Sequence, residues 1–537
     1  MSDLRILFIY PNQRSESIVP PCIAIFSRLL KQRGFTVDLF DTSQYDIDAD
    51  DYDNSPRNEG SERVGVQNLL AKPYEGLADA HRKHRNAVTD LNTKVNDYQP
   101  HLIAVTCTES TFLLATHLLR SISQYEIPNI VGGVFCTFAP QQAISCPEID
   151  MICVGEGENA IVDLCERMRA GKDYTNVTNL WVKKKSRRTN VESEIIKNPV
   201  SRAVNINEIP VGDFELFVDS RFYRPMYGKM YRMMPVETHR GCPYTCAFCN
   251  SPSQNQFYKN ETNSKFFRKR SMTRVREELL YFRNTLNAEY IFFWADTFFA
   301  WNNREFDEFC EIYQDIKLPF WCQTRTETVN SKKISKLAKV GLHMIAFGME
   351  HGNEAFRRDA LLRDYTNASA VKALEIPHQH GVPYTVNNII GFPGETRELA
   401  MDTVELNRQF DADQMGCSIF QPYQGTALRS RAVREGYIGT NTICPANSDD
   451  TKLNMPFFTS EEMRGLKRTF ALYVKFPKSR WNEIAEAEKF TPEGDAKWEK
   501  LANEYTSTQF NFPETDIRET GNTRPIEISQ NAPIATF

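Results

Sequence analysis

The sequence lacks an apolar run long enough to span a bilayer, which takes about 18 consecutive residues. The nearest approach, residues 290–301, is interrupted by Asp296 and Thr297. The N-terminus also lacks a basic region followed by an apolar one, because Asp3 and Arg5 lead directly into a short apolar segment. We therefore expect neither a membrane span nor a secretory signal.

An excess of charge of one sign is also missing. The chain has 64 Lys and Arg against 69 Asp and Glu, a formal net charge of -5. This balance argues against a general nucleic-acid surface. The one basic run, Lys183-Lys184-Lys185-Ser186-Arg187-Arg188, lies between two β-like stretches, and we interpret it as a solvated hairpin tip.

The cysteines lack the arrangement of a secreted disulfide framework. Their number, 13, is odd, and they are scattered through apolar stretches. Disulfide-rich secreted domains instead show an even number at regular spacings. We expect a protein with reduced thiols in the cytoplasm.

A fourth cysteine is absent from the segment 239–250, which holds Cys242, Cys246 and Cys249 in the spacing Cys-x3-Cys-x2-Cys. The next cysteine in the chain is Cys310. Electron-transfer clusters usually have four thiolates, so a four-iron cluster held by three leaves one iron open to another ligand. The alternative is a zinc site completed by His239, but structural zinc ligands usually come as two separated pairs.

This cysteine loop, with Phe248 directly before its last cysteine, resembles that of the radical S-adenosylmethionine (radical SAM) enzymes. The resemblance implies an oxygen-sensitive [4Fe-4S] cluster on Cys242, Cys246 and Cys249, with SAM on the open iron and Phe248 beside it. One electron from the cluster then splits SAM into methionine and a 5'-deoxyadenosyl radical. An external reductant of the flavodoxin or ferredoxin type is implied as a partner.

Four later segments match the same family in order: residues 290–296, 320–325, 344–352 and 387–396. Each matches a strand of the family's barrel with the polar residues at its carboxyl end, where parallel barrels place their chemistry. The alternative for each segment taken alone is an ordinary helix cap or a satisfied polar group. By resemblance, the SAM-binding residues are Phe248, Asp296 near the amino group, Arg325 on the carboxylate, Glu350, and Asn388 and Ile390, whose backbone flanks the adenine.

The first part of the chain alternates short apolar runs with helical stretches, which predicts a doubly wound parallel sheet. Ligands of such sheets bind beyond the carboxyl ends of the strands. Small and polar residues follow three of these ends, at 106–111, 132–134 and 155–158. The expected strands are 4–10, 36–40, 102–105, 129–131 and 151–154, with a helix at 23–33 that Gly34 ends.

These loops, together with Pro20-Pro21, resemble the cobalamin-binding domain that precedes the barrel in cobalamin-dependent radical SAM enzymes. The residues implied to bind cobalamin are Gln13, Pro21, Thr106, Thr108, Ser110, Gly132, Gly133, Val134, Gly155, Glu156 and Gly157. The motif Asp-x-His-x-x-Gly, whose His ligates cobalt in domains of the methionine synthase type, is absent. Gln13 or Arg14 is then the candidate to approach the lower face of cobalamin.

We predict an α/β chain with four parts. A Rossmann-like cobalamin-binding domain (1–175) and a linker with a hairpin (176–228) precede a partial (β/α)6 TIM-type radical SAM barrel (229–438) and a helical C-terminal region (439–537). Within the first part, 46–96 is an insertion whose second half, 74–95, has helical composition. The segment 421–426 ends the barrel, and helices are expected at 459–476, behind a capping box, and from Pro492, capped by Thr491.

The resemblance implies a cobalamin-dependent radical SAM methyltransferase acting on an unactivated carbon, or a phosphinate phosphorus, of a small molecule. SAM would serve both as the radical source and as the methyl donor, through methylcobalamin. One alternative keeps the cofactors but carries out a non-methylating rearrangement or cyclisation. A third hypothesis is a non-catalytic cobalamin or iron-sulfur sensor.

Overall fold

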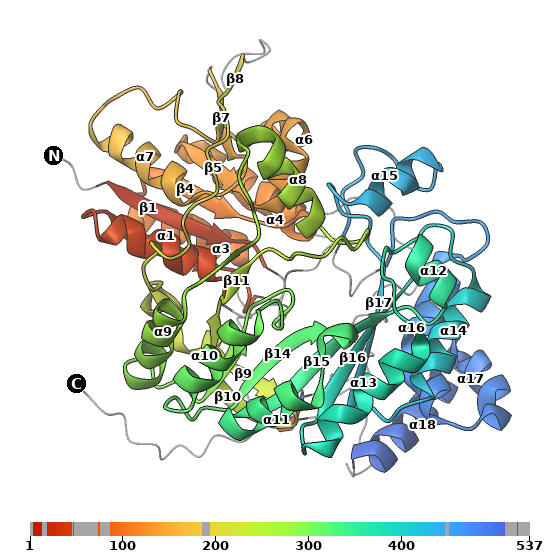
Figure 1. Cartoon of the computed structure of the whole chain (residues 1–537). Coiled ribbons are helices and arrows are strands. Elements are labelled where there is room, and N and C mark those ends of the chain that lie inside the picture. Colours follow the sequence, from red (N-terminus) through yellow and green to blue (C-terminus); the bar gives the residue numbers. More distant parts are fainter. Residues whose placement is uncertain are drawn as a thin grey trace.

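The computed structural model describes residues 4–12, 19–45, 47, 74–75, 86–184, 194–445, 450–510 and 523–524. Two seven-stranded sheets organise these residues, one in each of the two large parts of the chain (Figure 1). Within the described residues, no helix combines the length and the apolar character needed to cross a bilayer.

The first sheet has the strand order β2-β1-β4-β5-β6-β7-β8, which confirms the predicted doubly wound parallel sheet. Its first five strands are parallel, and β7 and β8 add an antiparallel hairpin at one edge. The strands are β1 (Arg5–Tyr10), β2 (Thr36–Asp41), β4 (Leu102–Thr106), β5 (Asn129–Gly132), β6 (Met151–Cys153), β7 (Leu180–Lys183) and β8 (Ile195–Lys197).

Helices cover both faces of this sheet (Figure 1). Alternate residues of β1 share one apolar core with α1 and α7, and the intervening residues share another with α3 and α4. Pro21 opens α1 at its first turn, a position where the missing N–H costs nothing. The helices are α1 (Pro21–Lys31), α3 (Ala87–Tyr98), α4 (Glu109–Ser121), α5 (Val134–Phe138), α6 (Pro140–Ser145) and α7 (Glu158–Arg169).

The second sheet has the order β17-β16-β15-β14-β13-β10-β9 and confirms the predicted partial barrel. Six strands are parallel, and β9 joins β10 as an antiparallel edge. The strands are β9 (Tyr223–Met226), β10 (Lys229–Val236), β13 (Tyr290–Phe293), β14 (Phe320–Arg325), β15 (Leu342–Glu350), β16 (Tyr384–Ile390) and β17 (Gln414–Ile419).

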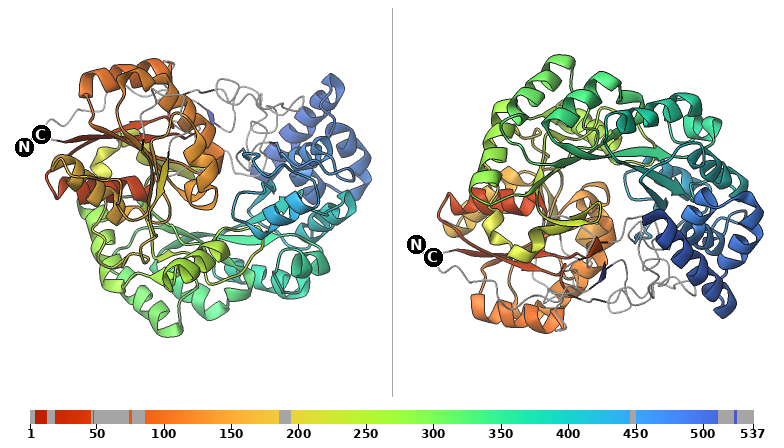
Figure 2. Two further views of the ribbon diagram at one scale, coloured as in Figure 1. Left: turned by 90° about the horizontal axis from the view of Figure 1, so that it is seen from above. Right: turned by 90° about the horizontal axis from the view of Figure 1, so that it is seen from below.

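This sheet is curved, with helices on its outer side and the first domain on the opposite side (Figure 2). Two short strands, β11 (His239–Arg240) and β12 (Arg268–Lys269), flank the cysteine loop. The helices of this part are α8 (Ser251–Thr262), α9 (Met272–Asn284), α10 (Asn303–Tyr313), α11 (Ser331–Val340), α12 (Glu354–Asp359), α13 (Asn367–Gln379) and α14 (Arg397–Asn407).

Helix α15 (Ala427–Arg434) follows β17 at the end of the barrel. The C-terminal region consists of α16 (Ser460–Lys475), which packs on β17 and α14, and of α17 (Trp481–Ala487) and α18 (Pro492–Phe510), which pack on α16. The predicted capping box holds, because Thr459 and Glu462 bond reciprocally. The Gly494 N–H donates to Thr491 Oγ1 at 3.1 Å, as expected of a cap. Helix α17 is short and was not predicted.

Two predictions of local structure were wrong. The prediction of helical structure over 74–95 fails at its start, because Tyr74–Glu75 form a strand (β3) that pairs with Thr523–Arg524 (β18). Helix α3 begins only at Ala87, where Asn86 accepts a capping bond from the Thr89 N–H. The sequence also predicts that the first barrel strand spans 236–238, directly before the cysteine loop, but the strand found there is β10, which ends at Val236. It is longer because it pairs with both β9 and β13.

Candidate active site

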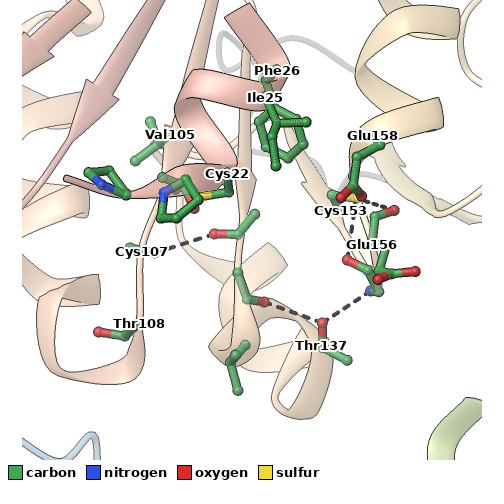
Figure 3. Close-up of a pocket in the computed structure, with 18 of the residues that line it drawn as sticks. Cys22, Ile25, Phe26, Val105, Cys107, Thr108, Thr137, Cys153, Glu156 and Glu158 are labelled. Atoms are coloured by element: carbon green, nitrogen blue, oxygen red, sulfur yellow. Dashed lines mark hydrogen bonds between the residues drawn. The ribbon is translucent and has the colours of Figure 1, made fainter. Parts of the chain in front are cut away.

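A cavity of about 830 Å³ lies at the carboxyl edge of the first sheet. Cobalamin is large, and this volume is near the upper end of the range for ligand pockets, about 300–1,000 Å³. Its inner part is apolar, with Phe8, Ile25, Phe26 and Ile161 between the sheet and helices α1 and α7 (Figure 3). The barrel also lines the cavity and contributes Glu237, Arg240, Gln254, Tyr258, Phe266 and Trp294.

Ten of the eleven residues predicted to bind cobalamin line this one cavity. They are Pro21, Thr106, Thr108, Ser110, Gly132, Gly133, Val134, Gly155, Glu156 and Gly157. The eleventh, Gln13, lies outside the described residues, as does Arg14. The strands therefore bring three separate loops to one site, and the mixed apolar and polar lining fits a large cofactor with an organic tail.

The glycine at position 133 has a structural reason within the chain itself. Its φ is +123°, and a Cβ there would stand 1.9 Å from the carbonyl oxygen of Cys107. The Thr137 hydroxyl donates to the Gly133 carbonyl at 3.2 Å and accepts from the Gly155 N–H at 3.0 Å (Figure 3). Gly133 thus lets two strand-end loops pack together, and close approach of a ligand is not needed to explain it.

A buried group of charges joins the cavity to the barrel. Arg240 donates to Glu156 at 2.7 Å, to Glu158 at 2.6 Å and to Glu237 at 3.0 Å. Arg268 also pairs with Glu156, with a 3.0 Å contact from Nη1 to Oε2. Burial raises the pKa of Glu156, but these two guanidiniums outweigh it and hold the pKa below its ordinary value.

Two backbone hydrogen bonds hold the cysteine loop against the loop after α12 and against α15. The Ala247 N–H donates to the Leu361 carbonyl at 3.1 Å, and the Leu428 N–H donates to the Ala247 carbonyl at 3.0 Å. All three thiols are free and partly or fully buried. They have separate polar neighbours: Thr297 Oγ1 lies 3.5 Å from Cys242, Arg325 Nη1 donates to Cys246 at 3.1 Å, and the Ser251 N–H donates to Cys249 at 3.4 Å.

These contacts fit a cluster held by three thiolates. Burial raises the pKa of the Cys249 thiol to about 11, so it is protonated at neutral pH unless a metal binds it. Cys310 lies on α10 in the core on the helical side of the sheet, away from the loop. The donors around the sulfur atoms would be able to bond to bound thiolates.

The zinc alternative finds no support in the loop's geometry. His239 Nδ1 bonds to Thr238 Oγ1 at 2.9 Å, and its ring lies between Trp301 and Phe267, at 4.9 and 6.0 Å. His239 is thus a buried core histidine, and burial lowers its pKa to about 3.

Beside the loop, two arginines and two glutamates form a linked group. Arg325 bonds to Glu327 at 2.7 Å, and Arg363 bonds to Glu350 at 2.7 Å. Burial raises the pKa of Glu350, opposed by Arg363 and Arg325. Glu350 has a φ of +68° at a shift in the register between β15 and β16, so the bulge redirects its side chain.

The other predicted SAM residues near the loop are Asp296 and Phe248. Asp296 accepts a hydrogen bond from Ser251 Oγ at 2.8 Å. Desolvation by the surrounding protein raises the pKa of this carboxyl, although the side chain is still exposed to solvent. Phe248 packs on Phe392, with ring centroids 5.9 Å apart. Arg325, Glu350 and Asp296 thus offer a guanidinium and two carboxylates, which match the carboxylate and ammonium of SAM.

The side chains of Asn388 and Ile390 face the outer helices. Asn388 bonds reciprocally with Asn407 of α14, at 2.9 and 3.1 Å, and Ile390 lies in the core shared with α16. Their backbone alone remains available to a ligand inside the barrel. The alternation of β16 points Asn387 inward instead, a residue that the sequence motif did not single out.

Sequence reasoning missed several residues that hold the site. Glu395 and His351 bond at 3.0 Å with both side chains fully buried, and Glu395 also accepts from the N–H groups of Gly391 and Phe392. Arg363 lies in the loop after α12, Tyr258 on α8 and Arg268 on β12, all between the motifs. Their positions in the sequence follow no periodic pattern and belong to no motif, so only the fold brings them to the site.

Two family profiles match the chain, the B12 binding domain over 62–165 and the radical SAM superfamily over 236–406. An uncharacterized methyltransferase of Pyrococcus horikoshii is 26% identical over 395 residues, which covers 72% of this chain and 81% of the relative. An anaerobic magnesium-protoporphyrin IX monomethyl ester cyclase of Cereibacter sphaeroides is 26% identical over 349 residues, or 63% of this chain and 54% of the relative.

Among solved structures, the radical SAM methyltransferase TsrM of Kitasatospora setae, with cobalamin and a [4Fe-4S] cluster bound, superimposes with a TM-score of 0.59. The match covers 95% of this chain and all of that one at 14% identity, so it shows a shared fold. The two profiles, the fold and the site together define a class. The chain belongs to the cobalamin-dependent radical SAM enzymes, whose cofactors are a [4Fe-4S] cluster, SAM and cobalamin.

Proposed function

We propose that this enzyme is a methyltransferase that methylates an unactivated carbon, or a phosphinate phosphorus, of a small molecule. The observation that carries this proposal is Arg240, which joins the two cofactor sites. It lines the large cavity and pairs with Glu156 and Glu158 of the first domain, while it stands two residues before Cys242. In this proposal the site for cobalamin and the site for radical generation are therefore adjacent.

The residues of the chain have distinct tasks in this proposal. Cys242, Cys246 and Cys249 hold the cluster, and Arg325 pairs with the SAM carboxylate, with Glu350 and Asp296 beside the amino group. When bound, the cluster and SAM supply a hydrogen-abstracting radical, and cobalamin carries the methyl group. One SAM yields methionine and 5'-deoxyadenosine, and a second yields S-adenosylhomocysteine.

The supporting relatives include a methyltransferase of Pyrococcus horikoshii and the methyltransferase TsrM. We further propose the four-part division at residues 175, 228 and 438, a cytoplasmic location, and an external one-electron reductant of the flavodoxin or ferredoxin type. In this proposal the charges of Arg325, Glu350 and Asp296 around the loop serve SAM, which a sensor without catalysis would not need.

The experiment supplies methyl-labelled SAM to the reduced protein loaded with cluster and hydroxocobalamin. Label in cobalamin together with S-adenosylhomocysteine is the expected result. A matched Cys246→Ala variant, which loses the cluster, should form no 5'-deoxyadenosine. Absence of label transfer, with 5'-deoxyadenosine still formed, would overturn the methyltransferase proposal.

A second candidate function is a non-methylating cyclisation or rearrangement. The observation that favours it is the match to the magnesium-protoporphyrin IX monomethyl ester cyclases of Cereibacter sphaeroides and Rubrivivax gelatinosus. Such an enzyme would form 5'-deoxyadenosine with its substrate and no stoichiometric S-adenosylhomocysteine. The ratio of these two products therefore separates the two candidate functions.

A further inference from the structure

The inner face of the barrel sheet carries an aromatic wall on one side and an exposed amide on the other. We propose that the substrate is a flat, uncharged ring system with an amide-like hydrogen-bonding group. It would stack against Trp294 and bond to Asn387. This inference rests on the proposed function, because it places the substrate inside the barrel, next to the cavity for cobalamin.

The two faces of the barrel sheet belong to different apolar cores. Ile291 and Phe293 of β13 lie in the core shared with the outer helices. Tyr290 belongs instead to a separate inner group with Met233, against which Phe292 and Trp321 pack. Because side chains alternate along a strand, residues 290, 292 and 294 all point inward.

The aromatic wall consists of Phe292, Trp321 and Trp294, and it opens toward the cavity. The Phe292 and Trp321 rings lie 4.1 Å apart at 12°, and Trp294 follows at 6.2 Å from Phe292. Tyr290 at the closed end is fully buried, whereas Trp294 is 42% exposed and lines the cavity. A large aromatic side chain open at an internal site presents a flat, apolar surface, which suits a flat partner.

The opposite side offers hydrogen-bonding groups. Asn387 of β16 is exposed, and its side chain has no hydrogen-bonding partner within the described part of the chain. Gly416 lies opposite it on β17, where a Cβ would come within 3.0 Å of Asn387 Oδ1, so the glycine leaves the amide free. One amide both donates and accepts, and a lactam or amide edge complements both groups.

Among the described residues, the charged groups at this end of the barrel are either paired with one another or assigned to SAM by the proposed function. Glu237 bonds to Arg240, Arg325 to Glu327 and Glu350 to Arg363. Asp296 bonds to the Ser251 hydroxyl, and the proposed function assigns it to SAM. An ionised substrate would lose its hydration without gaining a free counter-charge, which is unfavourable. The expected substrate is therefore uncharged.

The test uses the full chain loaded anaerobically with cluster, cobalamin and SAM. It is titrated calorimetrically with quinolin-2-one and with its ring-saturated counterpart, two neutral bicyclic lactams that differ in flatness. The flat lactam should bind roughly tenfold more tightly, a preference that stacking can supply. Trp294→Leu should abolish this preference, and Trp294→Phe should retain most of it. Asn387→Leu should weaken both lactams by a similar factor.

The control variant is Trp481→Leu, which removes a tryptophan on α17 far from the barrel interior and should leave both affinities unchanged. Equal affinity for the two lactams, no binding of either, or a preference that survives Trp294→Leu would overturn the proposal. Loss of the cobalamin absorption spectrum in Trp294→Leu would also overturn it, because Trp294 would then serve the cofactor. If label transfer from SAM to cobalamin fails while the lactam preference remains, only the proposed function fails.

Discussion

Arg325 Nη1 donates a hydrogen bond to Cys246 Sγ at 3.1 Å, so a guanidinium touches one of the three thiols of the loop. Glu327 holds the same side chain at 2.7 Å, and the Tyr244 ring lies 4.0 Å from its central carbon. Three contacts thus fix a residue that the sequence assigns to the carboxylate of SAM. In the proposed function, Arg325 therefore links the SAM site to the cluster site.

Arg325→Gln should shift the midpoint potential of the cluster to a more negative value. Loss of a positive donor to a thiolate destabilises the reduced cluster more than the oxidised one. For a one-electron couple, a tenfold change in the equilibrium constant for reduction of the cluster corresponds to about 60 mV. A potentiometric titration without SAM, followed by electron paramagnetic resonance, measures it. Arg325→Lys should shift the potential less, and an unchanged potential in Arg325→Gln would contradict a role at the cluster.

Cys246→Ala should lose most of the bound iron, because only two thiolates would remain in the loop. Cys310→Ala is the matched control, since Cys310 is buried in the core on the helical side of the sheet. That control should keep the iron content of the unaltered chain. Iron analysis after anaerobic reconstitution measures the iron bound by each variant. Equal iron in the two variants would show that the cysteine loop does not hold the cluster.

Gly133→Ala should destabilise the first domain by about 3–5 kcal/mol, through backbone strain and overpacking combined. Its φ is +123° and the new Cβ would meet the Cys107 carbonyl. Gly34→Ala is the control: its φ is +75°, but no atom lies within 4 Å of the added Cβ. This control should cost about 1 kcal/mol. Thermal unfolding measures the loss of stability in both variants. Similar losses in the two would refute the close packing at Gly133.

Glu156→Gln should destabilise the contact between the first domain and the barrel by about 3–5 kcal/mol. The substitution leaves Arg240 and Arg268 buried with less compensating charge. Glu166→Gln is the control, because Glu166 pairs with Arg33 at the surface and should cost less than about 1 kcal/mol. The midpoint of thermal unfolding should fall clearly only for Glu156→Gln. Equal midpoints would show that the ionic group does not join the domains.

His239 should make the chain less stable at mildly acidic pH. Its pKa is lowered to about 3 by burial, below the value of about 6.5 expected when unfolded. The unfolded state therefore binds the proton first, and stability falls as the pH drops below about 6.5. Between pH 7 and pH 5 the loss is up to about 2 kcal/mol.

His239→Phe keeps a ring between Phe267 and Trp301 but removes this titration. Urea unfolding of both proteins at pH 7 and pH 5 measures the difference in slope. The unaltered chain should lose more stability on acidification than the variant. Parallel losses in the two proteins would show that His239 takes up its proton freely when folded.

Much of the architecture could be predicted from the sequence because its strands are short apolar runs with polar ends. Parallel strands such as β1 and β4 are buried on both faces, and their carboxyl ends meet at one edge. The loops after them therefore fell in one cavity. The boundary at β10 could not be predicted, because its first half, from Lys229, is stabilised by the edge strand β9 rather than by local pattern.

Long-range partners were beyond the reach of the sequence. Arg363 meets Glu350 only because the loop after α12 returns over β15, and Tyr258 reaches the Glu156 N–H, at 2.7 Å, from helix α8. Motif matching selected Asn388, although the strand alternation directs Asn387 inward. A motif marks a segment, whereas the direction of each side chain depends on the sheet that the segment joins.

The central claim is that one chain holds both a cluster open to SAM and cobalamin. The most direct measurement is metal content and the absorption spectrum after anaerobic purification and reconstitution with hydroxocobalamin. The account predicts about four irons, as in a [4Fe-4S] cluster, and about one cobalt per chain. Iron without cobalt would contradict it, because the cavity of the first domain would then hold something other than cobalamin.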